Sequence, residues 1–97
     1  MPPEKELSMK VELTPTFINS LKKDPTRRIE ISDTKTGGLR FRLNPIGKSS
    51  WLYQKKIKGG LRRGFTLGTY PEMSLKQARL AAGAIELIAE RGIDPVQ

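Results

Sequence analysis

The basic side chains between positions 40 and 63 are the groups with the clearest capacity for chemistry. This stretch contains eight Lys and Arg residues and no Asp or Glu. Within it, Arg40 and Arg42 alternate with apolar residues, so in a β-strand their side chains would share one face of a sheet. An Arg side chain can bind a guanine edge through two hydrogen bonds, and both Lys and Arg bind phosphate. The pattern predicts a basic sheet face that binds a polyanion, and it fits DNA, RNA and acidic membranes alike.

The net charge is concentrated in the middle of the chain. The 97 residues, enough for one domain, carry 18 basic and 10 acidic side chains, a net charge of +8. Positions 22–63 hold 13 basic residues against three acidic ones, a net charge of +10, whereas positions 1–21 and 64–97 each carry −1. A face that only keeps a protein soluble usually mixes both signs. A polyanion is therefore the expected partner.

The composition argues against catalysis and against a cofactor. There are no cysteines and no histidines, which excludes a disulfide scaffold or a cysteine-based site and removes the commonest general base. The three acidic residues of the middle segment fit structural roles: Asp24 at a helix end, Glu30 on a strand and Asp33 in a turn. The pairs Gly37-Gly38 and Gly59-Gly60 are turn glycines, because neither pair opens a helix as a phosphate-binding loop would. We expect no cofactor, no metal and no small-molecule substrate.

The apolar residues are too dispersed for a membrane segment. The longest apolar runs span a few residues, which is too short for a transmembrane helix or a signal peptide. The sequence therefore predicts a soluble intracellular module without a membrane partner.

Two helices are predicted from their end signals. Thr14-Pro15 is a typical helix start, and Asp24-Pro25 is a typical end. Ser74 to Gln77 has the form of a capping box, which opens a longer helix that ends at Gly92. Residues 1–12 have little to bury and are expected to form a flexible lead.

Alternating apolar residues separated by turn residues predict the strands. These strands are expected at Arg28–Ser32, Leu39–Leu43, Ser50–Ile57 and Leu61–Leu67. The expected fold class is α+β: a three- to four-stranded antiparallel sheet packed on one long C-terminal helix, with a short N-terminal helix.

The register of the last hairpin depends on the length of its loop. A two-residue loop would pair Ile57 with Arg62 and mix charged with apolar groups on one face. It would likewise pair Trp51 with Gly68. A three-residue loop, Lys58-Gly59-Gly60, aligns the apolar groups, and its last glycine can supply the left-handed position that such loops need. We expect the three-residue loop, which pairs Ile57 with Leu61, Tyr53 with Phe65 and Trp51 with Leu67.

The two faces of this sheet have different expected roles. The inner face is most simply the core against the long helix, with Leu39, Phe41, Leu43, Trp51, Tyr53, Ile57, Phe65 and Leu67. On the outer face the expected opposing pairs are Arg40 with Gln54, Arg42 with Leu52, and Lys56 with Arg62. Adjacent like charges repel, so a sheet that keeps them is expected to meet an anion. The candidate DNA-binding residues are Arg40, Arg42, Gln54, Lys56, Arg62 and Thr66 on this face, with Lys48, Lys58 and Arg63 at the hairpin tips for phosphate.

Two other classes of function remain open from the residues alone. Trp51 and Tyr53 would stack on single-stranded bases if they were exposed, as in a small RNA- or DNA-binding protein. Their alignment with apolar residues of the next strand favours the core instead. A second apolar stripe on the long helix, Leu80, Ala84 and Leu87, could contact the N-terminal helix, a neighbouring domain or a second copy. In the last two cases the chain would be a protein-interaction module, and an independent enzyme is the least supported function.

Two runs of residues carry a family resemblance. The first is Ile31-Ser32-Asp33…Gly37-Gly38-Leu39-Arg40-Phe41-Arg42-Leu43, continuing to Trp51 and Tyr53. The second and more specific run is Thr66-Leu67-Gly68…Tyr70-Pro71…Ser74-Leu75…Ala78-Arg79, and Gly92-Ile93-Asp94-Pro95 closes the unit. Over roughly Leu13 to Pro95 the chain resembles the N-terminal arm-type DNA-binding domain of tyrosine integrases from prophages and genomic islands.

The resemblance implies a fold and a function. It implies a three-stranded antiparallel sheet that enters the major groove of arm-type sites, and sequence-specific binding of double-stranded DNA in support of integration and excision. Residues 13–95 would be the arm domain, and 96–97 would begin a linker to core-binding and catalytic domains that carry a tyrosine nucleophile. The chain would then be a non-catalytic piece of a site-specific recombinase. Its expected location is the bacterial cytoplasm at the nucleoid, and its expected partners are duplex DNA, the rest of the integrase and neighbouring protomers.

Overall fold

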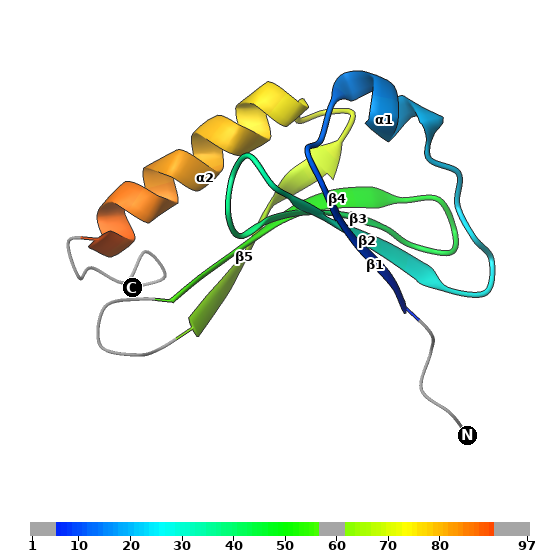
Figure 1. Cartoon of the computed structure of the whole chain (residues 1–97), viewed down its shortest axis with the longest axis horizontal. Helices are drawn as coiled ribbons and strands as arrows, with labels where there is room; N and C mark the ends of the chain where they lie inside the picture. Colours follow the sequence, from blue (N-terminus) through cyan, green and yellow to red (C-terminus); the bar gives the residue numbers. More distant parts are fainter. Residues whose placement is uncertain (1–5, 57–61, 91–97) are drawn as a thin grey trace.

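One strand precedes a short helix, the other strands follow it, and a long helix is the last described element (Figure 1). The structure is a computed structural model that describes residues 6–56 and 62–90. Its elements in chain order are β1 (Glu6–Val11), α1 (Pro15–Ser20), β2 (Arg28–Asp33), β3 (Leu39–Leu43), β4 (Ser49–Lys56), β5 (Arg62–Tyr70) and α2 (Leu75–Glu90).

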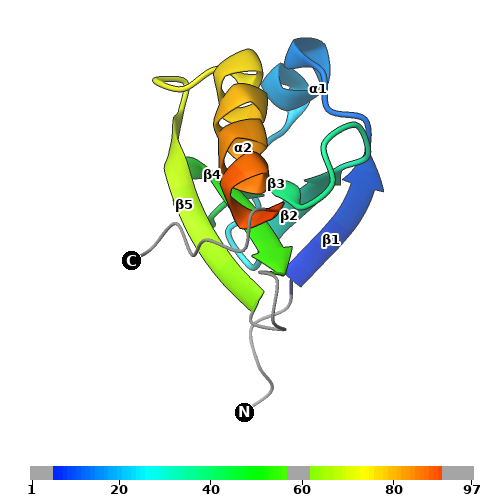
Figure 2. The same cartoon turned by 90° about the vertical axis from the view of Figure 1, so that its left-hand side faces the viewer.

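The strands form one mixed sheet in the order β1-β2-β3-β4-β5, and α2 packs on β3, β4 and β5. The α+β class and the two helices are confirmed. The prediction of a three- to four-stranded, purely antiparallel sheet is wrong, because the sheet has five strands and β1 pairs with β2 in parallel. Both edges of the sheet curl toward α2, which lies between β1 and β5 (Figure 2).

Strand β1 occupies part of the segment that the sequence predicts to be a flexible lead. Met9 pairs with Ile31, and Val11 pairs with Asp33. The connection through residues 12–27 contains α1, and it is long enough for the crossover that parallel strands require. The pairing depends on main-chain hydrogen bonds to the edge of β2, while Met9 and its neighbours Ser8 and Lys10 are exposed. Leu7, Met9 and Val11 alternate with polar residues, which is a strand pattern that the interpretation as a flexible lead did not use.

Both predicted helix starts are confirmed by their caps. The Thr14 hydroxyl accepts a hydrogen bond from the Phe17 N–H at 3.1 Å. At the start of α2 the Ser74 hydroxyl accepts from the Gln77 N–H at 3.2 Å, and the Gln77 side chain accepts from the Ser74 N–H at 2.8 Å, which completes the capping box. The predicted end at Gly92 lies outside the described residues.

Helix α1 ends earlier than the sequence predicts. Its last residue is Ser20, whereas Asp24-Pro25 was the expected end. Asp24 instead organises a separate turn, in which its carboxylate accepts hydrogen bonds from the Thr26 hydroxyl at 2.6 Å and from Arg27 Nε at 2.8 Å. The carboxylate that was read as a helix stop therefore belongs to the turn that leads into β2.

The β4–β5 pairing agrees with the predicted three-residue-loop register on the loop side of a bulge and departs from it beyond the bulge. Tyr53 opposes Phe65 and Lys56 opposes Arg62, as predicted. The pair of Ile57 and Leu61 and the loop 58–60 lie outside the described residues. Trp51 opposes Gly68 instead of Leu67, because a bulge shifts the register between Trp51 and Leu52. A bulge inserts one extra residue in one strand, which alternation in the sequence does not reveal.

The predicted β3–β4 register is wrong by two residues. Arg40 opposes Leu52 instead of Gln54, and Arg42 opposes Ser50 instead of Leu52. The turn is tighter than expected, since the Asn44 side chain accepts from the Lys48 N–H at 2.9 Å and β4 begins at Ser49. A shift of two residues keeps every side chain on its face, so the predicted assignment of side chains to the two faces is still correct.

The inner face of the sheet and one side of α2 form the core. On α2 the buried residues are Leu75, Ala78, Ala82 and Ala89, and the alanines allow the helix to lie close to the strands. Trp51 is fully buried, and its indole N–H donates to the Met73 carbonyl at 2.7 Å. Of the predicted inner-face residues, Leu39, Phe41, Leu43, Trp51 and Tyr53 are buried, Phe65 and Leu67 are partly buried against them, and Ile57 lies outside the described residues.

Candidate nucleic-acid interface

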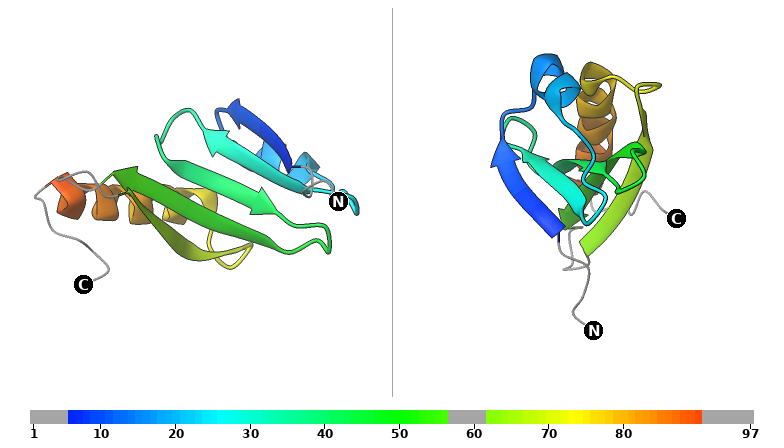
Figure 3. Two further views of the ribbon diagram at one scale, coloured as in Figure 1. Left: turned by 90° about the horizontal axis from the view of Figure 1, so that it is seen from below. Right: turned by 90° about the vertical axis from the view of Figure 1, so that its right-hand side faces the viewer.

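Among the described elements, both helices lie on the same side of the sheet, and the other face carries no helix. The left view of Figure 3 looks onto this face, with α1 and α2 behind the strands. Alternation with the core residues places Arg40 and Arg42 of β3, Gln54 of β4 and Thr66 of β5 here, since Phe41, Tyr53 and Phe65 point to the core. We call these four residues, with Glu30 of β2, the open sheet face.

The two arginines lie at the centre of the open sheet face. The side chains of Arg40 and Arg42 are 37% and 32% exposed. On β4, Arg40 opposes Leu52 and Arg42 opposes Ser50, and both neighbours are uncharged. The predicted pairing of Arg40 with Gln54 is therefore absent from the register. Gln54 and Thr66 are exposed farther along the same face. The structure therefore brings the two arginines together and sets uncharged residues beside them on β4.

The remaining strand candidates lie toward the loop that joins β4 to β5. Lys56 opposes Arg62 in the register, two positions along from the pair of Gln54 and Gly64. Arg63 opposes Lys55, and the amino group of Lys55 contacts Glu86 of α2 at 3.2 Å. Arg63 thus falls within β5 on the helix side of the strand, rather than at a hairpin tip.

The two candidates in turns are separated from each other. Lys48 is exposed in the turn between β3 and β4, at the opposite end of β4 from Lys56. Lys58 lies outside the described residues. The predicted basic residues therefore spread along the length of the sheet.

A buried glutamate links the two arginines of the open sheet face. Glu30 is 5% exposed and opposes Arg42 in the β2–β3 register. Its Oε1 accepts from Arg40 Nη1 at 2.8 Å, and its Oε2 accepts from Arg42 Nε at 3.1 Å and from Arg42 Nη2 at 3.0 Å. The two positive side chains therefore share one negative charge, and their mutual repulsion is reduced within the protein itself.

The electrostatics keep Glu30 ionised. Burial alone would raise the pKa of the Glu30 carboxyl, but the hydrogen bonds from Arg40 and Arg42 outweigh it and hold the pKa below its ordinary value. The sequence interpretation gave Glu30 no role beyond its strand. The alternation of β2 could have indicated this role. Glu30 lies between Ile29 and Ile31, whose side chains point to the core, so its own side chain lies on the same face as the arginines of the adjoining strand β3.

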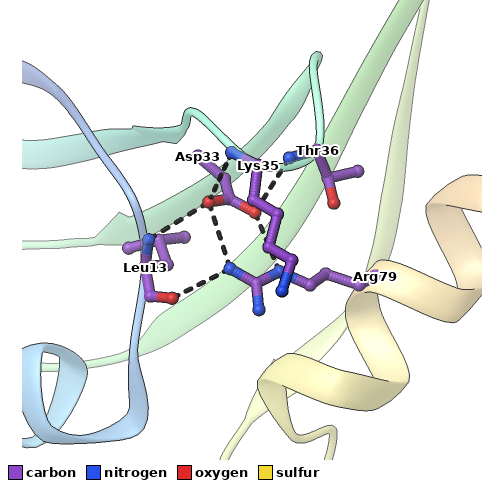
Figure 4. A network of polar contacts seen from close by, with 5 residues as sticks. All are labelled: Leu13, Asp33, Lys35, Thr36 and Arg79. Atoms are coloured by element: carbon purple, nitrogen blue, oxygen red, sulfur yellow. Dashed lines mark hydrogen bonds and ion pairs between the residues drawn. The ribbon is translucent and has the colours of Figure 1, made fainter.

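A second ion pair, on the helix side, joins three parts of the fold. The Asp33 carboxylate accepts from Arg79 Nε at 3.0 Å and from Arg79 Nη2 at 3.2 Å (Figure 4). It also accepts from the backbone N–H groups of Leu13, Lys35 and Thr36, at 3.1, 3.2 and 3.2 Å. Arg79 Nη2 further donates to the Leu13 carbonyl at 2.8 Å. We call these contacts the Asp33–Arg79 cluster.

The Asp33–Arg79 cluster holds α2 against the end of β2 and the segment before α1. The Asp33 side chain is fully buried. Burial alone would raise its pKa, yet the hydrogen bonds from Arg79 and from the Leu13 and Lys35 N–H groups keep the pKa below its ordinary value. The sequence interpretation placed Asp33 in a turn, which is correct for its contacts with Lys35 and Thr36. It missed the partner Arg79, which lies 46 residues away.

The structure bears on the two alternative functions. Every aromatic side chain packs in or against the core, and Trp51 and Tyr53 are at most 1% exposed, so the open sheet face has no aromatic group for stacking on bases. On α2, Leu80 and Leu87 are 66% and 55% exposed, so this stripe is not covered by α1.

The described residues form neither a metal-binding cluster nor a membrane-spanning helix. Among residues 6–56 and 62–90, no three Asp or Glu side chains gather into a group that could hold a metal ion. In the same part of the chain, neither helix combines the length and apolar character needed to cross a bilayer.

Comparison with protein families decides the relationship. Residues 13–97 match the arm DNA-binding domain, which is nearly the whole chain. The chain belongs to this family. Arm domains are the N-terminal domains of phage-type integrases, and the resemblance seen in the sequence is confirmed. No curated protein matches the chain. This arm domain binds DNA at arm-type sites, and strand β1 lies before the matched residues but within the same sheet.

Proposed function

We propose that this arm domain reads duplex DNA with its open sheet face, placing Arg40 and Arg42 against base edges in the major groove. The single observation that carries the proposal is this arginine pair on the face without a helix, inside a segment with a net charge of +10. The major groove admits a two-stranded β-ribbon, and the antiparallel pair of β3 and β4 at the centre of the sheet is the part that would enter it. Arginine binds guanine there through two hydrogen bonds.

The other predicted residues have supporting roles in the proposal. Gln54 can bind an adenine edge, and Thr66 can contact a thymine methyl group. Lys56, Arg62, Lys48, Lys58 and Arg63 bind phosphates and set the orientation of the sheet on the duplex. Binding to phosphates releases counterions, so affinity should fall with a log–log salt slope of about −0.9 for each phosphate contacted, or about −5 for six contacts.

The test distinguishes recognition of base edges by the arginines from attraction of their charge to any duplex. A selection of bound sequences from random duplexes first defines the preferred site. The double variant Arg40→Lys/Arg42→Lys keeps the charge but loses the planar fork of each guanidinium. It should lose about tenfold or more in affinity for the preferred duplex while its affinity for a scrambled duplex stays near that of the wild type. Equal losses on both duplexes would contradict base reading by these arginines.

A matched control lies on the other side of the molecule. Lys76→Ala removes one exposed positive charge from α2, away from the open sheet face. It should leave the ratio of the two affinities unchanged. If Lys76→Ala weakens binding as much as Arg40→Ala/Arg42→Ala does, the helix side and not the sheet is the binding surface.

We further propose that this domain serves a site-specific recombinase of a prophage or genomic island, acting on the bacterial nucleoid with neighbouring integrase protomers. Residues 13–95 form the arm domain on this proposal, and 96–97 begin the linker to core-binding and catalytic domains. Two observations support a nucleophile outside this domain. Tyr53 is 1% exposed, and the Tyr70 hydroxyl donates to Asn19 at 2.7 Å while its ring packs edge-on against Phe41. Mixing the domain with labelled arm-site duplex should give complexes without covalent DNA attachment, and a covalent product would contradict this assignment.

A further inference from the structure

We propose that Glu30 is the positioning residue of the DNA-binding face, which orients Arg40 and Arg42 before DNA arrives and so determines sequence preference. The inference rests on the proposed function of the open sheet face. It assigns a specificity role to a negative charge inside a surface that binds a polyanion.

The contacts leave donors of each guanidinium available to a ligand. Glu30 engages Nη1 of Arg40, so the Nε–Nη2 edge of Arg40 remains outside these contacts. It engages the Nε–Nη2 edge of Arg42, so Nη1 of Arg42 remains outside them. A guanidinium carries five N–H donors in a rigid fork, so fixing one edge also fixes the direction of the others. Glu30 therefore sets where the remaining donors point.

Burial makes Glu30 a rigid anchor. Its side chain is 6% exposed, and the strand residues on either side of it, Ile29 and Ile31, are core residues. The arginines are about one-third exposed, so they reach solvent while their inner ends are held. An arginine that is already ordered loses less conformational freedom when it binds a base. A flexible arginine can satisfy its charge on any nearby phosphate, which carries no sequence information.

This role gives two effects of opposite sign. Removing the charge of Glu30 makes the face more positive, so binding to any duplex should tighten. It also frees both arginines, so discrimination between duplexes should fall. A residue that serves only the fold would not separate these two quantities.

The experiment compares affinities of the whole chain for the selected duplex and a scrambled duplex, using Glu30→Gln, Glu30→Asp and Glu12→Gln. Glu30→Gln should reduce the affinity ratio about tenfold, the scale of one lost bidentate base contact, while binding to the scrambled duplex tightens. Glu30→Asp keeps the charge but shortens the side chain, so it should lower the ratio without tightening scrambled-duplex binding. Glu12→Gln is the matched control, because it removes one exposed negative charge and should preserve the ratio.

The outcomes distinguish this inference from the proposed function. If Glu30→Gln behaves like Glu12→Gln, the positioning role is wrong while the sheet still binds DNA. If Arg40→Ala/Arg42→Ala binds both duplexes like the wild type, the proposed function fails and this inference fails with it. The wild-type protein provides a check that needs no variant: NMR relaxation of the Arg42 Nε–H group should show an ordered side chain without DNA. A fully flexible signal at neutral pH would overturn the proposal.

Discussion

Two acidic residues of β2, three positions apart, bind arginine in opposite settings. Because side chains alternate along a strand, Glu30 faces the open sheet face and Asp33 faces the helix side. Arg40 and Arg42, which bind Glu30, are about one-third exposed and keep donors for a ligand. Arg79 is 22% exposed, and its donors are shared between Asp33 and the Leu13 carbonyl. The same pair of chemical groups therefore serves stability on the helix side and, on our proposal, DNA binding on the open sheet face, and the difference depends on what else the arginine contacts.

The largest expected effect breaks the helix-side pair. Asp33→Ala removes the acceptor for three backbone N–H groups and leaves the charge of Arg79 without its partner. Breaking a buried ion pair by removing one member typically destabilises by about 3–5 kcal/mol. Urea unfolding should show a loss of this order in the free energy of unfolding.

Asp24→Ala is the control for this comparison, since Asp24 pairs with Arg27 in a more exposed turn. Its loss should be clearly smaller than that of Asp33→Ala, because solvent screens the more exposed pair. Equal losses in the free energy of unfolding for the two variants would show that burial does not make the Asp33–Arg79 cluster more stabilising than the exposed pair.

The next effect is a dependence of stability on pH. The pKa values of Glu30 and Asp33 lie below their ordinary values of 4.5 and 3.8 in the folded protein. Their contribution is therefore fully present above about pH 5 and is lost as the pH falls through the folded pKa values, because the unfolded chain then binds more protons. Each unit of lowering contributes about 1.4 kcal/mol.

Single variants sharpen the comparison between the two carboxylates. Free energies of unfolding measured between pH 7 and pH 3 should decline less steeply for Asp33→Asn than for Glu30→Gln, because Asp33 accepts more of its hydrogen bonds from groups fixed by the fold. A steeper decline for Asp33→Asn than for Glu30→Gln would reverse that ranking.

The smallest expected effect concerns an ion pair that belongs neither to the Glu30 contacts nor to the Asp33–Arg79 cluster. Lys55 and Glu86 join β4 to α2 at 3.2 Å, with side chains 29% and 44% exposed. Exposed pairs of this kind contribute about 0–1 kcal/mol and weaken with salt. Lys55→Ala should lower stability by a few tenths of a kcal/mol at low salt and by less at high salt, as thermal unfolding at two salt concentrations would measure. A loss of stability comparable to that of Asp33→Ala would contradict the expectation that more buried ion pairs contribute more to stability.

Much of the fold was predictable because local signals agreed with it. The caps at Thr14 and Ser74 and the alternation around Phe41 each depend on residues within a few positions of one another. The face of Arg40 and Arg42 followed from the same alternation, so it survived a two-residue error in the register. Local sequence could not show that β1 pairs in parallel with β2, because the segment that contains α1 separates the two strands. It could not show the bulge at Trp51 either, because an extra residue leaves no distinct pattern.

The sequence by itself determined a one-domain α+β chain, a +10 middle segment and an arginine pair on one side of a strand, and its motifs placed it in its family. Only the tertiary structure decided the partners of those charges. It placed Glu30 beneath two arginines 10 and 12 residues away, and Asp33 beside an arginine 46 residues away. The physical reason is range: charge and periodicity are properties of a short segment, whereas an ion pair depends on which strands and helices lie side by side.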